Sequence, residues 1–238
     1  MKTLDQLKVK IFADGADLDG ILELYRNPRI TGFTTNPTLM RKSGILDYEK
    51  FARQVLEKIT DRPISFEVFS DEFNEMERQA RKIASWGHNV YVKIPVTNTR
   101  RESSVELISS LAQEKVKLNV TALMTLDQVR TVSGALADHT SSFISVFAGR
   151  IADTGRDPMP IMKEAVKIMS PYTTQELIWA SPRELLNIFH ADEIGCHVIT
   201  VTHDVLKKLS LVGKELDEYS LDTVKMFYGD ASKAGYQL

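Results

Sequence analysis

The chain has little of several things that would point to a particular class of protein. Cys196 is its one cysteine, which excludes an internal disulfide framework and a metal site built from several cysteines. No apolar run approaches the roughly 20 residues of a membrane-spanning helix, and the opening MKTLDQLKVK lacks the apolar segment of a secretory signal. We therefore expect a cytoplasmic protein with no membrane partner.

The chain also lacks an excess of charge of either sign. Its 30 lysines and arginines stand against 32 acidic residues, a formal net charge of -2. This balance favours neither nucleic acid nor an anionic membrane as a partner, so any anion must be recognised locally by a few placed arginines.

What the chain does contain is a regular alternation of apolar, β-rich runs with amphipathic helical segments, of which 71–86 and 126–138 are examples. The runs span 8–14, 30–36, 63–69, 89–96, 117–123, 143–149, 176–181 and 196–202. Most are almost continuously hydrophobic, as is typical of strands buried on both faces.

This repeated alternation predicts an α/β fold, a (β/α)8 TIM barrel formed as one domain by residues 1–238. An open, doubly wound sheet stays as the alternative, because periodicity does not show closure. Residues from about 216 to 238 follow the eighth unit as an extra C-terminal helix. Its apolar side chains must pack on the barrel or on another subunit.

Polar residues stand at the C-terminal ends of the predicted strands, where the catalytic groups of a barrel gather. They include Asp14, Thr34, Thr35, Asn36, Glu67, Lys93, Asn119, Thr121, Ser145, Arg150, Ser181 and Arg183. Taken singly, each has a structural explanation. Asp14 or Asp17 can cap a helix, and Asn36 can serve a turn. Glu67 can be no more than the ion-pair partner of Lys93.

Lys93 lies in the middle of the apolar run NVYVKIPV, where it either points to solvent or lies in a pocket. Polar groups on so many neighbouring strand ends favour the pocket. Desolvation favours the neutral amine of a lysine, which can attack a carbonyl and form a Schiff base. A Schiff base stabilises the carbanion needed to break or form a carbon–carbon bond, and a carboxylate such as Asp14 or Glu67 can move the protons. This chemistry needs no metal or other cofactor.

Arg150 and Arg183 follow the sixth and seventh predicted strands, and Ser181 stands beside them. Barrels often bind phosphate near the ends of strands 7 and 8, and the planar fork of arginine suits phosphate. We therefore expect a sugar phosphate as substrate. The alternative is that one or both arginines hold the rim of the barrel through salt bridges.

Together these residues resemble the transaldolase family, specifically the small-subunit branch that also contains the fructose-6-phosphate aldolases. The motifs are FADGA, GFTTNPTLM, SFEVF, VYVKIPVT, LNVTALMT, SVFAGRIADTG and WASPR, in this order. The resemblance implies a TIM barrel of the class I aldolase type that transfers a dihydroxyacetone unit from a ketose phosphate to an aldose phosphate. It also implies a homo-oligomer, a pentamer or decamer, whose C-terminal helix reaches a neighbouring subunit.

The resemblance also implies roles for individual residues. Lys93 would form the Schiff base, and Asp14 would take the proton of the C4 hydroxyl. Glu67 and Thr121 would position a catalytic water and shuttle protons during imine formation. The implied substrate-binding residues are Thr35, Asn36, Asn119, Ser145 and Phe147, with Arg150, Ser181 and Arg183 as the phosphate site.

Phe147 bears on the choice of reaction. The aldolases usually have tyrosine at this position, whose hydroxyl helps to release the intermediate, whereas phenylalanine is the transaldolase pattern. We therefore expect transfer to an acceptor, with release of free dihydroxyacetone as the alternative. Val146 and Pro182 depart from the residues common in the family and lie beside the presumed phosphate site.

Two other classes of protein fit parts of the sequence. A metal-dependent barrel enzyme could use His203 and Asp204 after the eighth strand, but no further ligand stands at a compatible strand end, and His203 is better explained as a helix cap. A barrel without catalytic activity could bind a sugar phosphate or partners. It would gain nothing from keeping Asp14, Glu67 and Lys93 together.

Overall fold

Eight parallel strands close into a barrel in chain order in the computed structural model, which describes residues 2–237. They are β1 (Lys10–Asp14), β2 (Ile30–Thr34), β3 (Ile64–Glu67), β4 (Val90–Pro95), β5 (Leu118–Leu123), β6 (Ser142–Val146), β7 (Gln175–Trp179) and β8 (Val198–Thr202). Because β8 pairs with β1, the predicted TIM barrel is confirmed and the open sheet is excluded.

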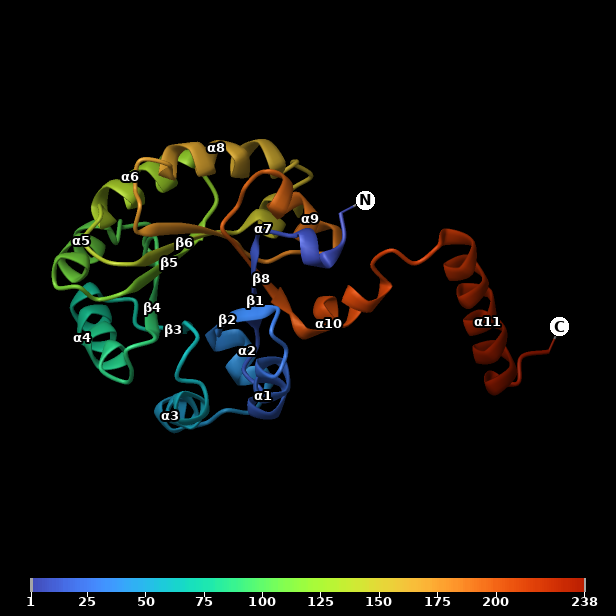
Figure 1. Cartoon of the computed structure of the whole chain (residues 1–238). Coiled ribbons are helices and arrows are strands. Elements are labelled where there is room, and N and C mark those ends of the chain that lie inside the picture. The colour runs from blue at the N-terminus through green and yellow to red at the C-terminus, as the bar shows by residue number, and fades with distance from the viewer. Residues whose placement is uncertain (1, 238) are drawn as a thin grey trace.

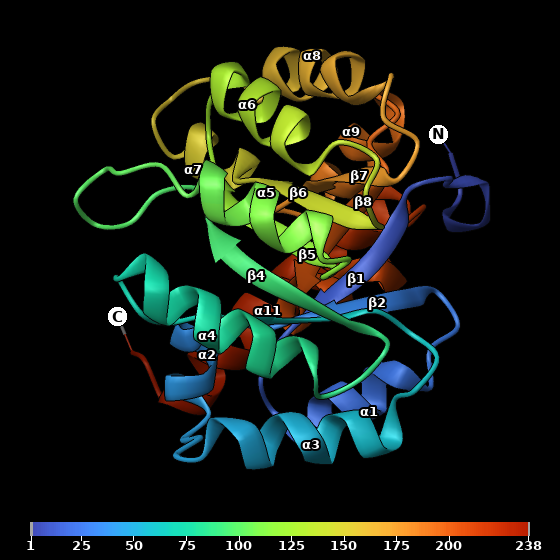
Figure 2. The same ribbon diagram turned by 90° about the vertical axis from the view of Figure 1, so that its left-hand side faces the viewer.

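The helices surround the barrel, as Figure 1 and Figure 2 show from two directions, except for the last helix, which stands apart from it. They are α1 (Leu18–Tyr25), α2 (Pro37–Lys42), α3 (Tyr48–Lys58), α4 (Phe73–Ala84), α5 (Val105–Gln113), α6 (Leu126–Leu136), α7 (Ala148–Ala152), α8 (Met159–Met169), α9 (Leu186–Glu193), α10 (His203–Leu206) and α11 (Leu216–Ala234).

Side-chain caps fix where several of these helices begin. Asp17 accepts from the backbone N–H of Gly20 at 2.7 Å and caps α1, so the carboxylate of Asp14 is not the cap. Asn36 caps α2. The cap of α10 is Thr202, and the expectation that His203 caps this helix is wrong, because His203 is its first residue.

The strands separate two layers of core because successive side chains point to opposite faces. On β4, Val92 and Ile94 belong to the layer between the barrel and the helices. Tyr91 instead joins Phe12 and Phe143 inside the barrel. Lys93 has the same parity as Tyr91, which places it inside as well.

The barrel interior is filled by large rings at its N-terminal half. Phe12 and Phe143 meet edge to face, with ring centroids 5.4 Å apart. Gly32 makes room for the Phe12 ring, since a Cβ on residue 32 would lie 2.6 Å from that ring. Only the C-terminal half of the interior is left for polar groups.

Helix α11 begins at residue 216, as predicted, and stands away from the barrel in Figure 1. The structure thus does not show it packed on its own barrel. Its large apolar side chains Leu216, Leu221, Val224, Phe227 and Tyr228 are 50–81% exposed. No helix within residues 2–237 is both long and apolar enough to cross a membrane.

Candidate active site

A cavity of about 570 Å³ opens at the C-terminal ends of the strands, a size typical of small-molecule sites. Most of the predicted site residues line it: Asp14, Asn36, Glu67, Lys93, Thr121, Ser145, Phe147, Arg150, Ser181 and Arg183. Thr35 and Asn119 do not line it.

Lys93 lies at the floor of this cavity and is only 6% exposed. Its Nζ donates to the backbone carbonyl of Thr35 at 2.9 Å and lies 3.3 Å from Oε2 of Glu67. Glu67 is the register partner of Lys93 on β3, so the sheet itself brings the two side chains to the same level. The lysine is therefore buried and compensated, as the pocket interpretation predicts.

Asp14 reaches the cavity from β1. The hydroxyl of Thr34 donates to Oδ1 of Asp14 at 2.8 Å and also contacts the hydroxyl of Thr200 on β8. Burial raises the pKa of the Asp14 carboxyl above its ordinary value, although the charge of Lys93 and the Thr34 hydrogen bond act in the opposite direction. Such a carboxylate is suited to accept and return a proton.

Thr121 faces the cavity by ordinary strand alternation, two residues after the inward Asn119, and an irregularity in β5 lets the next residue, Ala122, line the cavity as well. The register of β5 against β6 shifts between Val120 and Leu123, and Ala122 has a φ of 66°. The Thr121 hydroxyl is buried and has no hydrogen-bond partner within residues 2–237. Its hydrogen-bonding capacity is therefore not used by any group of the described residues.

Two of the predicted substrate-binding residues serve the scaffold beneath the cavity. The Thr35 hydroxyl donates to the carbonyl of Ser65 at 2.9 Å, so Thr35 contributes its own carbonyl, not its side chain, to Lys93. Asn119 donates to the hydroxyl of Ser65 at 2.9 Å and accepts from Ser145 at 2.7 Å. Asn36, by contrast, lines the cavity while its side-chain oxygen accepts from the N–H of Leu39 at 3.0 Å, which leaves its NH₂ group for a ligand.

The predicted phosphate end combines α7 with the turn after β7. Arg150 and Arg183 both line the cavity there. Arg183 also donates to Asp153, with Nε 2.9 Å from Oδ1, so the salt-bridge alternative describes part of its role. Ser181 has a φ of 60°, and its carbonyl lies against Gly149 so closely that a Cβ on residue 149 would be 1.5 Å away.

The two departures from the family pattern lie on different sides of this end. Val146 is fully buried in the layer between the barrel and the helices, so it does not face the cavity. Pro182 lines the cavity directly.

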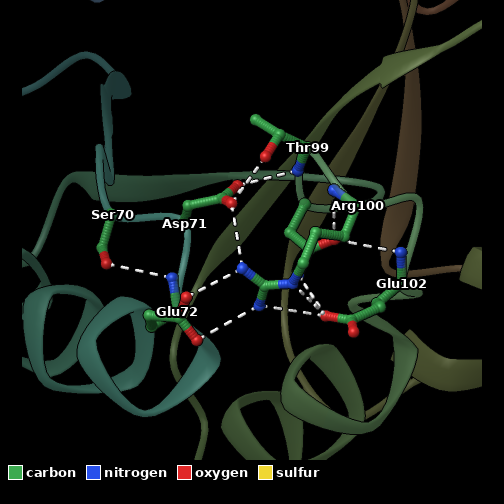
Figure 3. Close-up of polar contacts among 7 residues, drawn as sticks. Ser70, Asp71, Glu72, Thr99, Arg100 and Glu102 are labelled. Atoms are coloured by element: carbon green, nitrogen blue, oxygen red, sulfur yellow. Dashed lines mark hydrogen bonds and ion pairs between the residues drawn. The ribbon is translucent and has the colours of Figure 1, made fainter.

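The rim loops that follow β3 and β4 are tied together by Arg100 (Figure 3). Its guanidinium bridges Glu72, at 2.8 Å, Asp71, at 3.4 Å, and Glu102, at 3.1 Å. Asp71 also accepts from the backbone N–H of Thr99 at 2.7 Å. These contacts fix the loops above the strands that carry the candidate lysine and glutamate.

Thr34, which the sequence places at a strand end but not among the substrate-binding residues, lines the cavity two residues after the inward Gly32. Sequence reasoning missed several other residues that line the cavity, among them Thr200 on β8. Lys42 at the end of α2 and Ala122 at the irregularity of β5 also line the cavity, and neither has a periodic signal. Within the described part of the chain, no three His, Cys, Asp or Glu side chains are grouped as metal ligands.

A family model described as "Transaldolase/Fructose-6-phosphate aldolase" matches residues 11–238. The chain belongs to this family. A probable transaldolase of Dehalococcoides mccartyi is 35% identical over 202 residues, which cover 84% of this chain and 90% of that relative. A probable transaldolase of Thermoanaerobacter sp. is 32% identical over 231 residues, which cover 97% of this chain and all of the relative, 100%.

Solved structures of lower identity share the fold of this transaldolase-family enzyme. The crystal structure of 2,3-dimethylmalate lyase matches with a TM-score of 0.53 and 12% identity, over 98% of this chain and 86% of that one. The putative copper homeostasis protein CutC from Streptococcus agalactiae gives a TM-score of 0.59 and 12% identity, over 81% and 97%. These likenesses describe the barrel alone.

Proposed function

We propose that the enzyme transfers a dihydroxyacetone unit from a ketose phosphate to an aldose phosphate through a Schiff base on Lys93. The observation that carries the proposal is a lysine amine buried at the floor of the cavity between two carboxylates, Glu67 at 3.3 Å and Asp14 on β1.

The first half of the reaction forms the imine. Lys93 first gives a proton to Glu67, whose carboxylate lies 3.3 Å from Nζ, and the amine then attacks the C2 carbonyl of the ketose. One proton passes from the nitrogen to the former carbonyl oxygen, which gives a carbinolamine. Glu67 returns its proton to the hydroxyl of the carbinolamine, which leaves as water, and the protonated imine remains. The unpaired hydroxyl of Thr121 supports this step as a contact for the water.

The second half breaks and remakes a carbon–carbon bond. Asp14 takes the proton of the C4 hydroxyl, the C3–C4 electron pair moves into the protonated imine, and an aldose phosphate leaves. The enamine that remains attacks the carbonyl of the acceptor aldehyde, and Asp14 returns the proton to the new hydroxyl. Hydrolysis of the imine then frees the product ketose and Lys93.

The phosphate group of either sugar would bind Arg150, Ser181 and Arg183, which together line the phosphate end of the cavity. Phe147 lines the cavity without a hydroxyl that could assist release of the intermediate, which supports transfer over release. The fructose-6-phosphate aldolase reaction is the alternative within the same lysine chemistry.

A homo-oligomer and a cytoplasmic, reducing setting belong to the same proposal. The exposed apolar side chains of α11 support a neighbouring subunit as their cover, in a pentamer or decamer as the family resemblance implies. The single thiol, Cys196, is buried and unpaired, which agrees with a reducing compartment.

The test compares two assays with fructose 6-phosphate, one with erythrose 4-phosphate as acceptor and one without. We expect rapid turnover only with the acceptor. Release of free dihydroxyacetone at the same rate without the acceptor would establish the aldolase alternative. Lys93→Met, which keeps the apolar stem and removes the amine, should be inactive in both assays.

A further inference from the structure

The edge of β3 next to the catalytic glutamate is left open by the neighbouring strand. β2 pairs with β3 only at Phe33–Ile64 and Thr34–Ser65, after which the chain turns into α2. The last ladder bond on this edge runs from the N–H of Thr35 to the carbonyl of Ser65. The backbone of Glu67, two residues further on, points to the same edge beyond the end of β2.

One hydroxyl satisfies both backbone groups at this open edge. The N–H of Glu67 donates to Oη of Tyr48 at 2.7 Å, and Oη of Tyr48 donates to the carbonyl of Glu67 at 2.8 Å. Tyr48, the first residue of α3, thus stands in for the absent strand. We propose that Tyr48 is a positioning residue that sets the place of the Glu67 carboxylate beside Lys93.

The ring of Tyr48 is held so that its hydroxyl has little freedom. It packs against Phe66, Phe69 and Trp86, with ring centroids 6.3, 5.6 and 5.7 Å away. Asp47 caps α3 immediately before it and fixes the start of the helix. Burial raises the pKa of the Tyr48 phenol, so this group remains a neutral donor across the ordinary working range of pH.

The opposite edge of the same segment is fixed by the lysine strand. The N–H of Val68 donates to the carbonyl of Lys93 at 3.0 Å. Glu67 is therefore clamped between Tyr48 on one side and β4 on the other, with its carboxylate 3.3 Å from Nζ of Lys93. Without the Tyr48 hydroxyl, one donor and one acceptor lose their partner, and the segment can shift to regain them.

A shift of about 1 Å at a catalytic group can cost about a hundredfold in rate. The inference rests on the proposed function, since it assumes that Glu67 moves protons during imine formation. Tyr48 acts only through Glu67 and does not touch the reacting atoms in this scheme.

The experiment measures the single-turnover rate at which fructose 6-phosphate becomes trapped by borohydride in four proteins: wild type, Tyr48→Phe, Glu67→Gln and the double variant. Tyr91→Phe is the matched control, because Tyr91 is also a buried tyrosine whose hydroxyl has a protein partner, Ser141 at 2.8 Å. We expect Tyr48→Phe to slow trapping at saturating fructose 6-phosphate by about tenfold or more, with little change in the substrate concentration that gives half the maximal rate, and Tyr91→Phe to match the wild type. In the Glu67→Gln background the second change should have no effect, because there is no carboxylate left to position.

Two results would overturn the inference. One is a trapping rate of Tyr48→Phe equal to that of Tyr91→Phe. The other is that Tyr48→Phe slows trapping by the same factor in the Glu67→Gln background as in the wild type. Should Tyr48→Phe not fold, hydrogen exchange at the Glu67 amide of the wild type decides, because slow exchange supports the Tyr48 bond and rapid exchange contradicts it. Failure of the proposed function would look different from failure of this inference, since the wild type itself would then trap no substrate.

Discussion

Gly149 offers a sharp test of the phosphate end of the cavity. A Cβ at this position would lie 1.5 Å from the carbonyl oxygen of Ser181, where at least 3.0 Å is needed. The obstacle is backbone, so Gly149→Ala must push α7 and the Ser181 turn apart by about 1.5 Å. That turn already holds a positive φ at Ser181, which limits how it can relax.

The size of the effect follows from this displacement. Overpacking a close contact costs about 1–3 kcal/mol of folding stability, or a fall in Tm of roughly 2–12 °C for a chain of this length. Moving Ser181 and Arg183 by more than about 1 Å should lower kcat/KM for fructose 6-phosphate by about a hundredfold. Lys93, on β4, should be spared, so trapping of free dihydroxyacetone by borohydride should remain near the wild-type rate.

Gly134→Ala is the control, because Gly134 lies within α6 and nothing stands within 4 Å of the added Cβ. It should be neutral or stabilising by up to about 1 kcal/mol. The reasoning is refuted if Gly149→Ala keeps kcat/KM for fructose 6-phosphate within about twofold of the wild type. It is equally refuted if trapping of unphosphorylated dihydroxyacetone falls as far as turnover of the phosphate.

Three further predictions follow. Because burial raises the folded-state pKa of Asp14 above its unfolded value, its ionisation at pH 7 opposes folding. Asp14→Asn should therefore raise Tm at pH 7, and this gain should vanish as the pH falls below the unfolded-state pKa of about 3.9. The same variant should block C3–C4 cleavage. A lower Tm at pH 7, measured by calorimetry, would contradict this. Thr34→Val removes a hydrogen bond to the Asp14 carboxylate and should move the acid limb of the cleavage pH profile to higher pH, whereas an unmoved limb would exclude a role for Thr34. Replacing Leu221 and Phe227 on α11 by serine should shift gel filtration toward the 26.9 kDa of a single chain; a wild type that already elutes at that mass would refute an oligomer built on α11.

The barrel could be predicted from the sequence because strands buried on both faces leave long apolar runs. Each predicted run overlaps its observed strand, and most errors are one or two residues at the ends, as for 89–96 against the observed Val90–Pro95. The largest error is at β6, where the predicted run 143–149 extends beyond Val146, the last residue of the strand. The apolar run continues there because Ala148 and Gly149 of α7 are buried too.

The placement of Lys93, Glu67 and Asp14 in one cavity could also be predicted, because parallel strands of a barrel all end at the same rim. The motif TTNP alone does not say which threonine faces inward, and it is Thr34, not Thr35, that lines the cavity. The irregularity at Ala122, the Tyr48 hydroxyl at the edge of β3 and the Arg100 bridges depend on contacts between distant segments. No local pattern in the chain marks such contacts.

The most direct measurement for the central claim is the mass map of the enzyme after reduction by borohydride in the presence of fructose 6-phosphate. The account predicts a single modified peptide that carries a reduced three-carbon unit on Lys93, and none in Lys93→Met. A stable, folded wild type that gains no mass, or that carries the unit on another lysine, would contradict it.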